Sequence, residues 1–311
     1  MKQAIIDLGT NTFHLLIAEK QFDASYTTLF RESRPAKIGQ AGINQGVITD
    51  EGIDRALTVL RYFRQKLDEF GVSTDQVVAT GTSAIRVARN QQAFIDRVRE
   101  VTGIPIQVIS GAQEADYIYR GVRAAGALGE QTALVMDIGG GSVEFILGNV
   151  SRIFWKQSFE IGGQRLLERF MPGDRSVPIN ATSIRRLHNY FQEQLLPLTN
   201  GIHQYEPSVL VGSSGTFDTL VDMWYMHERG HLPAPEQTAF DLPVSEFYRA
   251  YEQLITRNHD ERMKIPGMIE LRADMIVVAV CLIDYILKTY GLKQITTSTY
   301  SLKEGVLSQL P

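Results

Sequence analysis

The chain has 311 residues, of which 44% are hydrophobic and 21% charged, and its formal net charge is −4. This length is sufficient for two domains of ordinary size, since domains typically span about 100–200 residues. A general nucleic-acid-binding surface usually brings a strong positive excess, so the charge balance disfavours nucleic acid as a partner. A polyanionic substrate would need a locally basic binding site.

The single cysteine, Cys281, excludes an internal disulfide and a cysteine-based zinc site, and it is typical of a reducing compartment. The longest apolar run, Met275–Ile283, is too short for a bilayer span of about 20 residues. The first residues contain no apolar stretch of the kind that forms a signal peptide. We therefore expect a cytoplasmic protein with no membrane partner.

Two parts of the sequence repeat one pattern. Residues 4–13 (AIIDLGTNTF) run through Asp7 into a small polar turn, and residues 134–145 (LVMDIGGGSVEF) do the same through Asp137. In each, a second apolar run follows the turn, which predicts a β-hairpin. A further strand, VVATGTS or VLVGSSGT, begins 70 residues after Asp7 and 72 residues after Asp137. Two matched pairs at nearly one offset indicate two related halves.

Helices are expected between these strands. Thr49 is the expected N-cap of a helix through Phe70, with one apolar face and Gly71 as its end. Asn90 is the expected N-cap of a shorter helix, which ends before Gly103.

The second half of the chain is richer in helical patterns. Residues 111–124 and 271–290 are predicted helices, and Thr182 is expected to cap another that ends near Leu196. An insertion at about 217–290 is expected to be mostly helical. Residues 293–307 (KQITTSTYSLKEGVL) predict a final strand and helix.

The two glycine turns are candidates for anion binding. Turns of this composition expose backbone N–H groups, and glycine lets the backbone approach a ligand closely. Two such turns, one from each half, could hold successive phosphates across a cleft. The alternative is a pair of ordinary hairpins, but the aspartate before each glycine segment favours the functional interpretation. The candidate phosphate-binding residues in the turns are Gly9, Thr10, Asn11, Thr12, Gly139, Gly140, Gly141, Ser142, Gly212, Ser213, Ser214 and Gly215.

Three acidic residues are candidate metal ligands. Asp7 and Asp137 end buried strands, where a carboxylate is costly unless it is paired or bound to a cation. Magnesium takes one or two carboxylates together with waters and phosphate oxygens. Glu144 follows Asp137 by seven residues, and pairing of the two strands brings it back toward Asp137. Asp137 and Glu144 are the predicted pair; for Glu144 a solvated strand position is the alternative.

Glu114 lies early in the helix predicted after Ser110. An acid there is favoured by the helix dipole, so helix capping is one interpretation. A general base that takes a proton from an attacking water is the other. The sequence pattern leaves both open.

Among the basic residues, Arg86 is the candidate phosphate ligand, because it follows the turn TGTSAIR and a guanidinium can bind two phosphate oxygens. Arg31, Arg34 and Lys37 are expected to form a solvated surface. His14, in the first hairpin, is the histidine of interest.

The segments DLGTNTFHLLI, ATGTSAIR, ISGAQEA, DIGGGSVEF and GSSGT, in this order, resemble the exopolyphosphatase/guanosine pentaphosphate phosphohydrolase family over about residues 4–308. The resemblance implies an α/β fold of duplicated actin-like (ribonuclease H-like) domains, each a mixed sheet flanked by helices, with an interdomain cleft. We expect residues 1–126 to form one lobe, with the C-terminal helix at 300–311 as a candidate completion. Residues 127–299 are expected to form the other lobe, with a hinge near 126–131.

The resemblance also implies roles. Glu114 matches the family's water-activating glutamate, and Asp137 and Glu144 match its magnesium-associated acids, with Mn²⁺ as an alternative metal. The glycine turns match its phosphate loops, and Arg86 matches a residue that contacts substrate phosphates. The family often has arginine at the position of His14 and a second glutamate at that of Gln113. Longer members carry further helical domains, so the sequence resembles a short, two-domain member.

The implied function is removal of the terminal phosphate from inorganic polyphosphate by Mg²⁺-assisted attack of water. One alternative is a guanosine pentaphosphate phosphohydrolase or another nucleotide phosphatase or ATPase, since GSSGTFDTL resembles the adenosine-side loop of the wider superfold. A non-catalytic phosphate or nucleotide sensor is the second, although pure binding has no use for a base. The sequence leaves open whether a homodimer completes a substrate channel.

Overall fold

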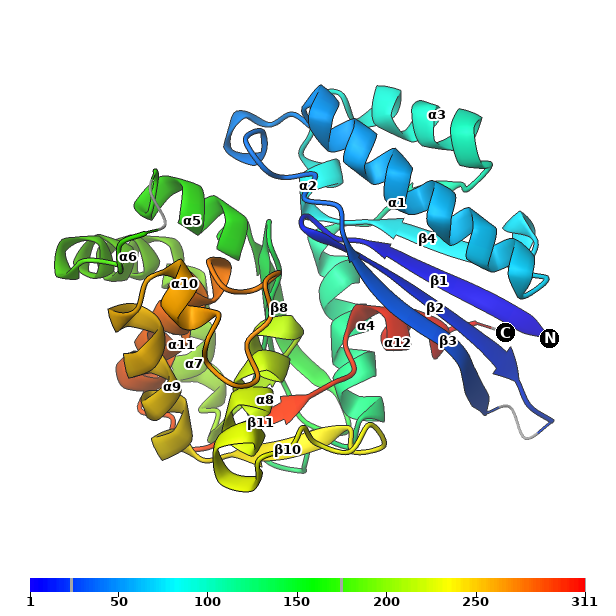
Figure 1. The fold of residues 1–311 in the computed structure, drawn as a ribbon. Helices are drawn as coiled ribbons and strands as arrows, with labels where there is room; N and C mark the ends of the chain where they lie inside the picture. Colours follow the sequence, from blue (N-terminus) through cyan, green and yellow to red (C-terminus); the bar gives the residue numbers. More distant parts are fainter. Residues whose placement is uncertain (23–24, 174–175, 311) are drawn as a thin grey trace. The chain divides into compact units, whose positions relative to one another are not determined.

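The computed structural model describes residues 1–22, 25–173 and 176–310 (Figure 1). The chain forms two compact units. Unit 1 is Met1–Glu114 together with the last residues from Gln309, and unit 2 is Ala115–Ser308. The boundary between the units falls inside one helix, α4 (Gly111–Ala124). The expected lobes, 1–126 and 127–299, place it about twelve residues later in the chain, and the position of the hinge stays a prediction.

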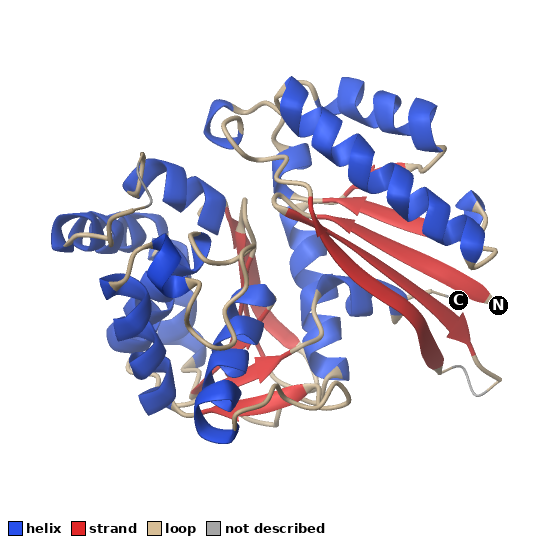
Figure 2. Cartoon of the chain, in the orientation of Figure 1, coloured by secondary structure: helices blue, strands red, loops and turns tan. Residues whose placement is uncertain are grey.

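Unit 1 contains a mixed five-stranded sheet in the order β3-β2-β1-β4-β5 (Figures 1 and 2). The central strand β1 is antiparallel to β2 on one side and parallel to β4 on the other. Most residues of β1 and β2 are buried, as their apolar runs predict. The strands are β1 (Lys2–Leu8), β2 (Thr12–Lys20), β3 (Tyr26–Pro35), β4 (Val77–Gly81) and β5 (Ile106–Val108).

The helices of unit 1 agree closely with the sequence pattern. α1 (Asp50–Glu69) and α3 (Gln91–Thr102) pack together on one face of the sheet (Figure 1), and the short α2 (Ser83–Arg86) follows β4. Thr49 Oγ1 accepts a hydrogen bond of 3.1 Å from the amide of Gly52, which confirms it as the N-cap of α1. Asn90 precedes α3 as expected, but its side chain bonds to the backbone of Ile48 instead of capping the helix.

Unit 2 contains a six-stranded mixed sheet in the order β10-β11-β9-β6-β7-β8. Its central strand β6 is antiparallel to β7 and parallel to β9. The strands are β6 (Ala133–Ile138), β7 (Val143–Gly148), β8 (Ile153–Phe159), β9 (Val209–Ser213), β10 (Ala239–Leu242) and β11 (Ile295–Ser298).

The strand register confirms the internal repeat. Asp7 pairs with His14 across the first hairpin, and Asp137 pairs with Glu144 across the second, at the same spacing. On the parallel side, Asp7 lies opposite Thr80 and Asp137 opposite Ser213. Each half therefore places an aspartate at the same point of an equivalent sheet, where a glycine turn begins.

Helix α11 (Met275–Tyr290) is the centre of the unit 2 core. Its residues are buried on almost every side, and it packs against α5, α6 and α9. Within the described residues, no helix combines the length and the apolar character that a membrane crossing needs. The remaining helices of unit 2 are α5 (Gly163–Phe170), α6 (Ala181–Gln194), α7 (Leu196–Tyr205), α8 (Gly215–Arg229), α9 (Val244–Thr256), α10 (His259–Arg262) and α12 (Leu302–Leu307).

Three details of unit 2 differ from the sequence expectations. The N-cap of α6 is Asn180, whose side chain accepts from the amide of Ser183 at 2.8 Å, so the prediction of Thr182 was wrong. Helix α11 begins at Met275 rather than at 271, since the preceding residues form turns. The insertion expected to be mostly helical also contributes the strand β10, which pairs with β11.

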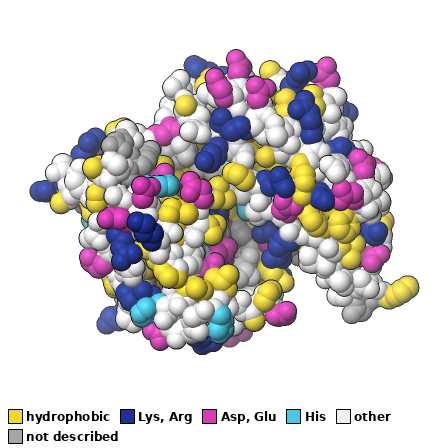
Figure 3. All heavy atoms as spheres, in the orientation of Figure 1, with side chains coloured by type: hydrophobic (Ala, Val, Ile, Leu, Met, Phe, Trp, Pro, Cys, Tyr) yellow, Lys and Arg dark blue, Asp and Glu magenta, His cyan; other side chains and the backbone are white. Residues whose placement is uncertain are grey.

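Surface charge is mixed. On the face drawn in Figure 3, basic and acidic side chains lie interspersed, as the small net charge of −4 would suggest.

Candidate active site

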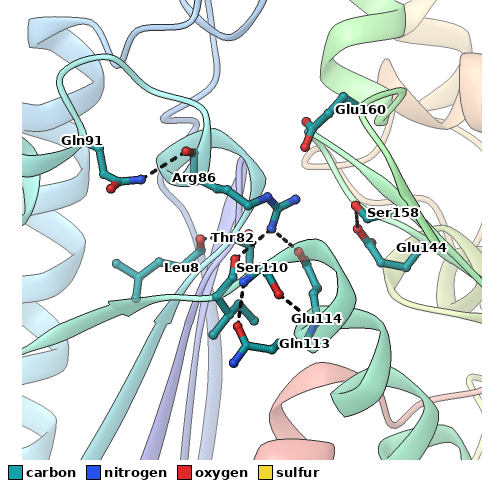
Figure 4. A network of polar contacts seen from close by, with 12 residues as sticks. Leu8, Thr82, Arg86, Gln91, Ser110, Gln113, Glu114, Glu144, Ser158 and Glu160 are labelled. Atoms are coloured by element: carbon teal, nitrogen blue, oxygen red, sulfur yellow. Dashed lines mark hydrogen bonds and ion pairs between the residues drawn. The ribbon is translucent and has the colours of Figure 1, made fainter. Parts of the chain in front are cut away.

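The candidate residues are distributed over both units. In unit 1, Glu114 lies in the first turn of α4 and is 7% exposed. Its Oε2 accepts a hydrogen bond of 2.7 Å from Nη1 of Arg86, at the end of α2 (Figure 4). A buried carboxylate needs such a partner to remain ionised. The structure thus joins the candidate base to the candidate phosphate ligand.

The start of α4 is capped by its neighbours. Ser110 Oγ accepts from the amide of Gln113 at 3.2 Å, and Gln113 Oε1 accepts from the amide of Ser110 at 2.9 Å (Figure 4). This reciprocal pair is a capping box. Capping, one of the two interpretations open for Glu114, is therefore performed by Ser110 and Gln113. It also explains what a glutamine does at position 113.

The first glycine turn, residues 9–12, has its carbonyls held from one side. Thr10 O accepts from the amide of Gly39 at 3.0 Å, and Asn11 O accepts from the amides of Ala36 and Lys37 at 2.9 Å each. A Cβ at Gly9 would lie 2.8 Å from the carbonyl oxygen of Thr12, so the turn requires glycine there. The close backbone approach explains the residue types that the sequence shows.

The threonine hydroxyls of this turn indicate a ligand-binding site. Thr10 and Thr12 are only 3% and 5% exposed. Within the described part of the chain, Oγ1 of neither residue has a hydrogen-bond partner. Buried hydroxyls of this kind are normally satisfied, and a bound anion would satisfy them. In the same hairpin, Nδ1 of His14 lies 2.6 Å from Oγ of Ser33 on β3.

In unit 2, Asp137 and Glu144 lie opposite each other on β6 and β7 and are 6% and 1% exposed. Directly opposed residues of an antiparallel pair direct their side chains to one face of the sheet. Asp137 Oδ2 accepts hydrogen bonds from Ser213 Oγ at 2.6 Å and Ser301 Oγ at 2.5 Å. Glu144 Oε1 accepts one from Ser158 Oγ at 2.7 Å (Figure 4).

The electrostatics of this pair fit a divalent cation. Burial raises the pKa of Asp137, and the hydrogen bonds from Ser213 and Ser301 oppose that rise. Two neighbouring buried carboxylates repel each other unless positive charge lies between them. Two carboxylates on one face are a donor set suited to Mg²⁺. Asp7, the third candidate ligand, lies in unit 1, at the position equivalent to Asp137.

The second glycine turn, residues 139–142, closes with a hydrogen bond of 3.0 Å from the amide of Gly139 to Ser142 O. Ser142 is buried, and Gly140 and Gly141 form the tip. As in the first turn, the carbonyls are held from one side, here by residues 162–165 at the start of α5.

The third candidate turn, residues 212–215, differs from the other two because charged side chains of the protein contact it. Ser213 directs its hydroxyl to Asp137, and Ser214 has a left-handed backbone with φ of 75°. At Gly215, a Cβ would lie 2.0 Å from Nη2 of Arg272. The backbone of this turn is therefore packed against an arginine.

Sequence reasoning missed the surroundings of this third turn. Burial raises the pKa of Asp218 to about 7, although Lys303 and Arg272 lower it. Arg272 and Lys303 are also the positive charges near Asp137. Ser301, which bonds to Asp137, was missed as well. Arg272, Ser301 and Lys303 belong to no glycine turn and to no repeated segment, so the pattern contained no signal for them. Asp218 did carry a signal, because it follows the start of β9 at the same distance at which Arg86 follows the start of β4.

Comparison with known proteins gives a consistent result. The sequence model of the Ppx/GppA phosphatase family matches residues 16–310. The crystal structure of an exopolyphosphatase from Cytophaga hutchinsonii superposes with a TM-score of 0.93 at 49% sequence identity, covering 99% of this chain and 96% of that one. An Aquifex aeolicus Ppx/GppA family member has a TM-score of 0.78 at 24% identity, with 99% and 96% covered, and so shares the fold.

Proposed function

The chain belongs to the Ppx/GppA phosphatase family, and on this basis we propose that it removes the terminal phosphate of inorganic polyphosphate by metal-assisted attack of water. The substrate is suggested by the exopolyphosphatase of Cytophaga hutchinsonii, which is 49% identical over 99% of this chain. The observation that carries the chemistry is the buried acid pair, Asp137 and Glu144, beside a glycine turn.

Asp137 and Glu144 are the residues that would hold Mg²⁺, with Mn²⁺ as an alternative; Asp7 is a further candidate ligand. A bound Mg²⁺ supplies positive charge that neutralises the non-bridging phosphate oxygens. The serines at 158, 213 and 301 each donate to one of the two carboxylates of the pair, which fixes the orientation of the ligands.

Glu114 acts as the general base in this proposal. Its carboxylate orients the attacking water and accepts its proton. Arg86 donates to that carboxylate at 2.7 Å and so fixes its position. A guanidinium has five donors, so Arg86 can also contact an oxygen of the transferring phosphoryl group.

The glycine turns provide the remaining charge stabilisation. Amides at 9–12 and 139–142 are donors for phosphate oxygens, and the buried hydroxyls of Thr10 and Thr12 add two more. Fixed donors of this kind stabilise the charge that develops in phosphoryl transfer. Gly212, Ser214 and Gly215 stay candidate contacts for a second part of the substrate, whereas the hydroxyl of Ser213 is engaged by Asp137.

A substrate panel tests the proposal. Phosphate release is measured from long-chain polyphosphate, tripolyphosphate, ATP and guanosine pentaphosphate, each with Mg²⁺, with Mn²⁺ and with a chelator. We expect polyphosphate to be the best substrate and the chelator to stop release. Preference for guanosine pentaphosphate would establish the nucleotide alternative, and binding without release would establish the sensor.

The variant Glu114→Gln tests whether Glu114 is the general base. Glutamine keeps the shape and can still accept from Arg86, but it cannot take a proton. We expect turnover to fall by at least about 100-fold, the lower range for a positioned general base, while the affinity for polyphosphate is retained. Undiminished phosphate release by this variant would remove Glu114 from the mechanism.

A further inference from the structure

One short segment, residues 162–164, holds the first three carbonyls of the second glycine turn. The amide of Gly163 donates to Gly139 O at 2.9 Å, and that of Gln164 donates to Gly140 O at 2.8 Å. The amide of Gly162 donates to Gly141 O at 3.1 Å. The carbonyls of residues 139–141 therefore all face the start of α5.

This arrangement decides where the amides of the turn point. In a planar trans peptide, the C=O and the N–H of the next residue point in opposite directions, and the described chain contains no cis peptide bond. Since the carbonyls of residues 139–141 face α5, the amides of residues 140–142 face away from it. A row of amides on one side of a turn is what an anion site requires.

Arg165 adds a charged donor to this support. Its Nε donates to Gly141 O at 2.8 Å, and its Nη2 donates to Glu160 Oε2 at 2.8 Å. The arginine side chain is 14% exposed and that of Glu160 is 40% exposed. Hydrogen bonds from an ionised donor are about twice as strong as neutral ones. Gly141 O thus accepts hydrogen bonds from both a backbone amide and a guanidinium. The same peptide plane contains the amide of Ser142.

The packing leaves the turn little room to move toward α5. A Cβ at Gly162 would lie 2.4 Å from the carbonyl carbon of Gly141 and 2.5 Å from that of Gly140. In the first half, Arg55 donates to the carbonyls of Ala36 and Lys37, so it supports the loop behind the turn. In unit 2, by contrast, the guanidinium contacts a carbonyl of the turn itself.

We propose that Arg165 is a positioning residue that keeps the amides of the 139–142 turn aimed at a phosphoryl group. It acts through the peptide plane shared by Gly141 and Ser142, and Glu160 holds its far end. The inference rests on the proposed function, because it takes a phosphoryl group as the ligand of this turn.

The test compares Arg165→Met and Arg165→Lys with a matched control, Arg169→Met. Arg169 is an exposed arginine of the same helix, and its guanidinium lies 4.3 Å from the ring centroid of Tyr190. For each variant, kcat and KM with polyphosphate, the affinity for tripolyphosphate with Mg²⁺, the melting temperature and hydrogen–deuterium exchange at residues 140–142 are measured.

We expect Arg165→Met to lower kcat/KM by about 10- to 100-fold, less than the 10²–10³ typical of losing a donor that contacts the transition state directly. It should bind tripolyphosphate more weakly and exchange the turn amides faster than the control at a similar melting temperature. Arg165→Lys should recover part of the loss, because an ammonium can still donate to Gly141 O.

Equal kinetic constants for Arg165→Met and Arg169→Met would overturn the inference, and so would a loss explained wholly by the unfolded fraction. Failure of the proposed function gives a different result, namely no phosphate release from any substrate by the unaltered protein. In that case the affinity for tripolyphosphate tests the inference. Weaker binding by Arg165→Met than by Arg169→Met supports the positioning role, and equal binding rejects it.

Discussion

Asp137 combines burial with a charge that protein groups only partly compensate. Burial raises the pKa of its carboxyl, and the opposing groups are two serine hydroxyls and the charges of Lys303 and Arg272. A neutral amide of the same shape avoids the desolvation of a charge. A buried aspartate at this position is therefore better explained by cation binding than by a contribution to folding stability.

The variant Asp137→Asn separates these two effects. In a chelator, we expect its melting temperature to equal or exceed that of the unaltered protein, because the buried charge is gone. Mg²⁺ at 100 times its dissociation constant should stabilise the unaltered protein by about 2.7 kcal/mol, and most of this gain should be absent from the variant. Thermal unfolding with and without Mg²⁺ measures both.

Asp241→Asn is the matched control, since Asp241 is an exposed acid of the same unit, on β10. It should keep the full stabilisation by Mg²⁺. A shift of unaltered size in Asp137→Asn would mean that the cation does not depend on Asp137.

At the level of elements, the first turn of α4 carries both its own cap and the candidate base. Gln113 completes the capping box, and Glu114 is the next residue. Any fraying of this turn would therefore displace the carboxylate that Arg86 holds. The stability of the helix start and the geometry of the reaction are coupled at adjacent positions.

We expect Gln113→Ala to cost about 1 kcal/mol of folding free energy, the usual value of a lost capping interaction. It should also lower kcat by about tenfold, since displacements of the order of 1 Å in an active site cost up to 10²-fold. Denaturant unfolding and steady-state kinetics measure the two effects.

Asn180→Ala is the control, because it removes the cap of α6 and none of the candidate site residues lies on that helix. It should lower stability to a similar degree and leave kcat unchanged. Equal kinetics for the two variants would show that the cap of α4 does not position Glu114.

The sequence predicted elements well where one local signal dominates. Thr49 before an amphipathic run, and glycine after α3, set their helix ends as expected. It predicted poorly where two local signals compete, as at Asn180 and Thr182, or where tertiary pairing decides, as in the short strand β10. Asp7, Asp137 and the glycine turns could be singled out because duplication repeats them. Arg165, Arg272 and Ser301 act through contacts that no spacing reveals.

For the whole molecule, the two units have separate hydrophobic cores. One core is built from residues of unit 1 between Ala4 and Ile104, and the other from residues of unit 2 between Leu134 and Ile295. Both tryptophans, Trp155 and Trp224, belong to unit 2. Tryptophan fluorescence therefore reports the unfolding of unit 2, whereas circular dichroism reports both units.

This arrangement predicts that Mg²⁺ acts unequally on the two signals. Because Asp137 and Glu144 both lie in unit 2, we expect Mg²⁺ to raise the urea midpoint seen by fluorescence more than that seen by circular dichroism. An equal rise in both midpoints would mean that the two units unfold as one cooperative block, or that ligands in unit 1 contribute equally.

The register places His14 in the first hairpin at the position that Glu144 holds in the second. This one difference gives the two hairpins different donor chemistry. Opposite Asp137 a second carboxylate adds a negatively charged oxygen donor of the kind that Mg²⁺ prefers, whereas opposite Asp7 an imidazole offers a nitrogen instead. Two hairpins of the same register therefore differ in the cations they can hold, and of the two only the second brings a pair of carboxylates to one face of its sheet.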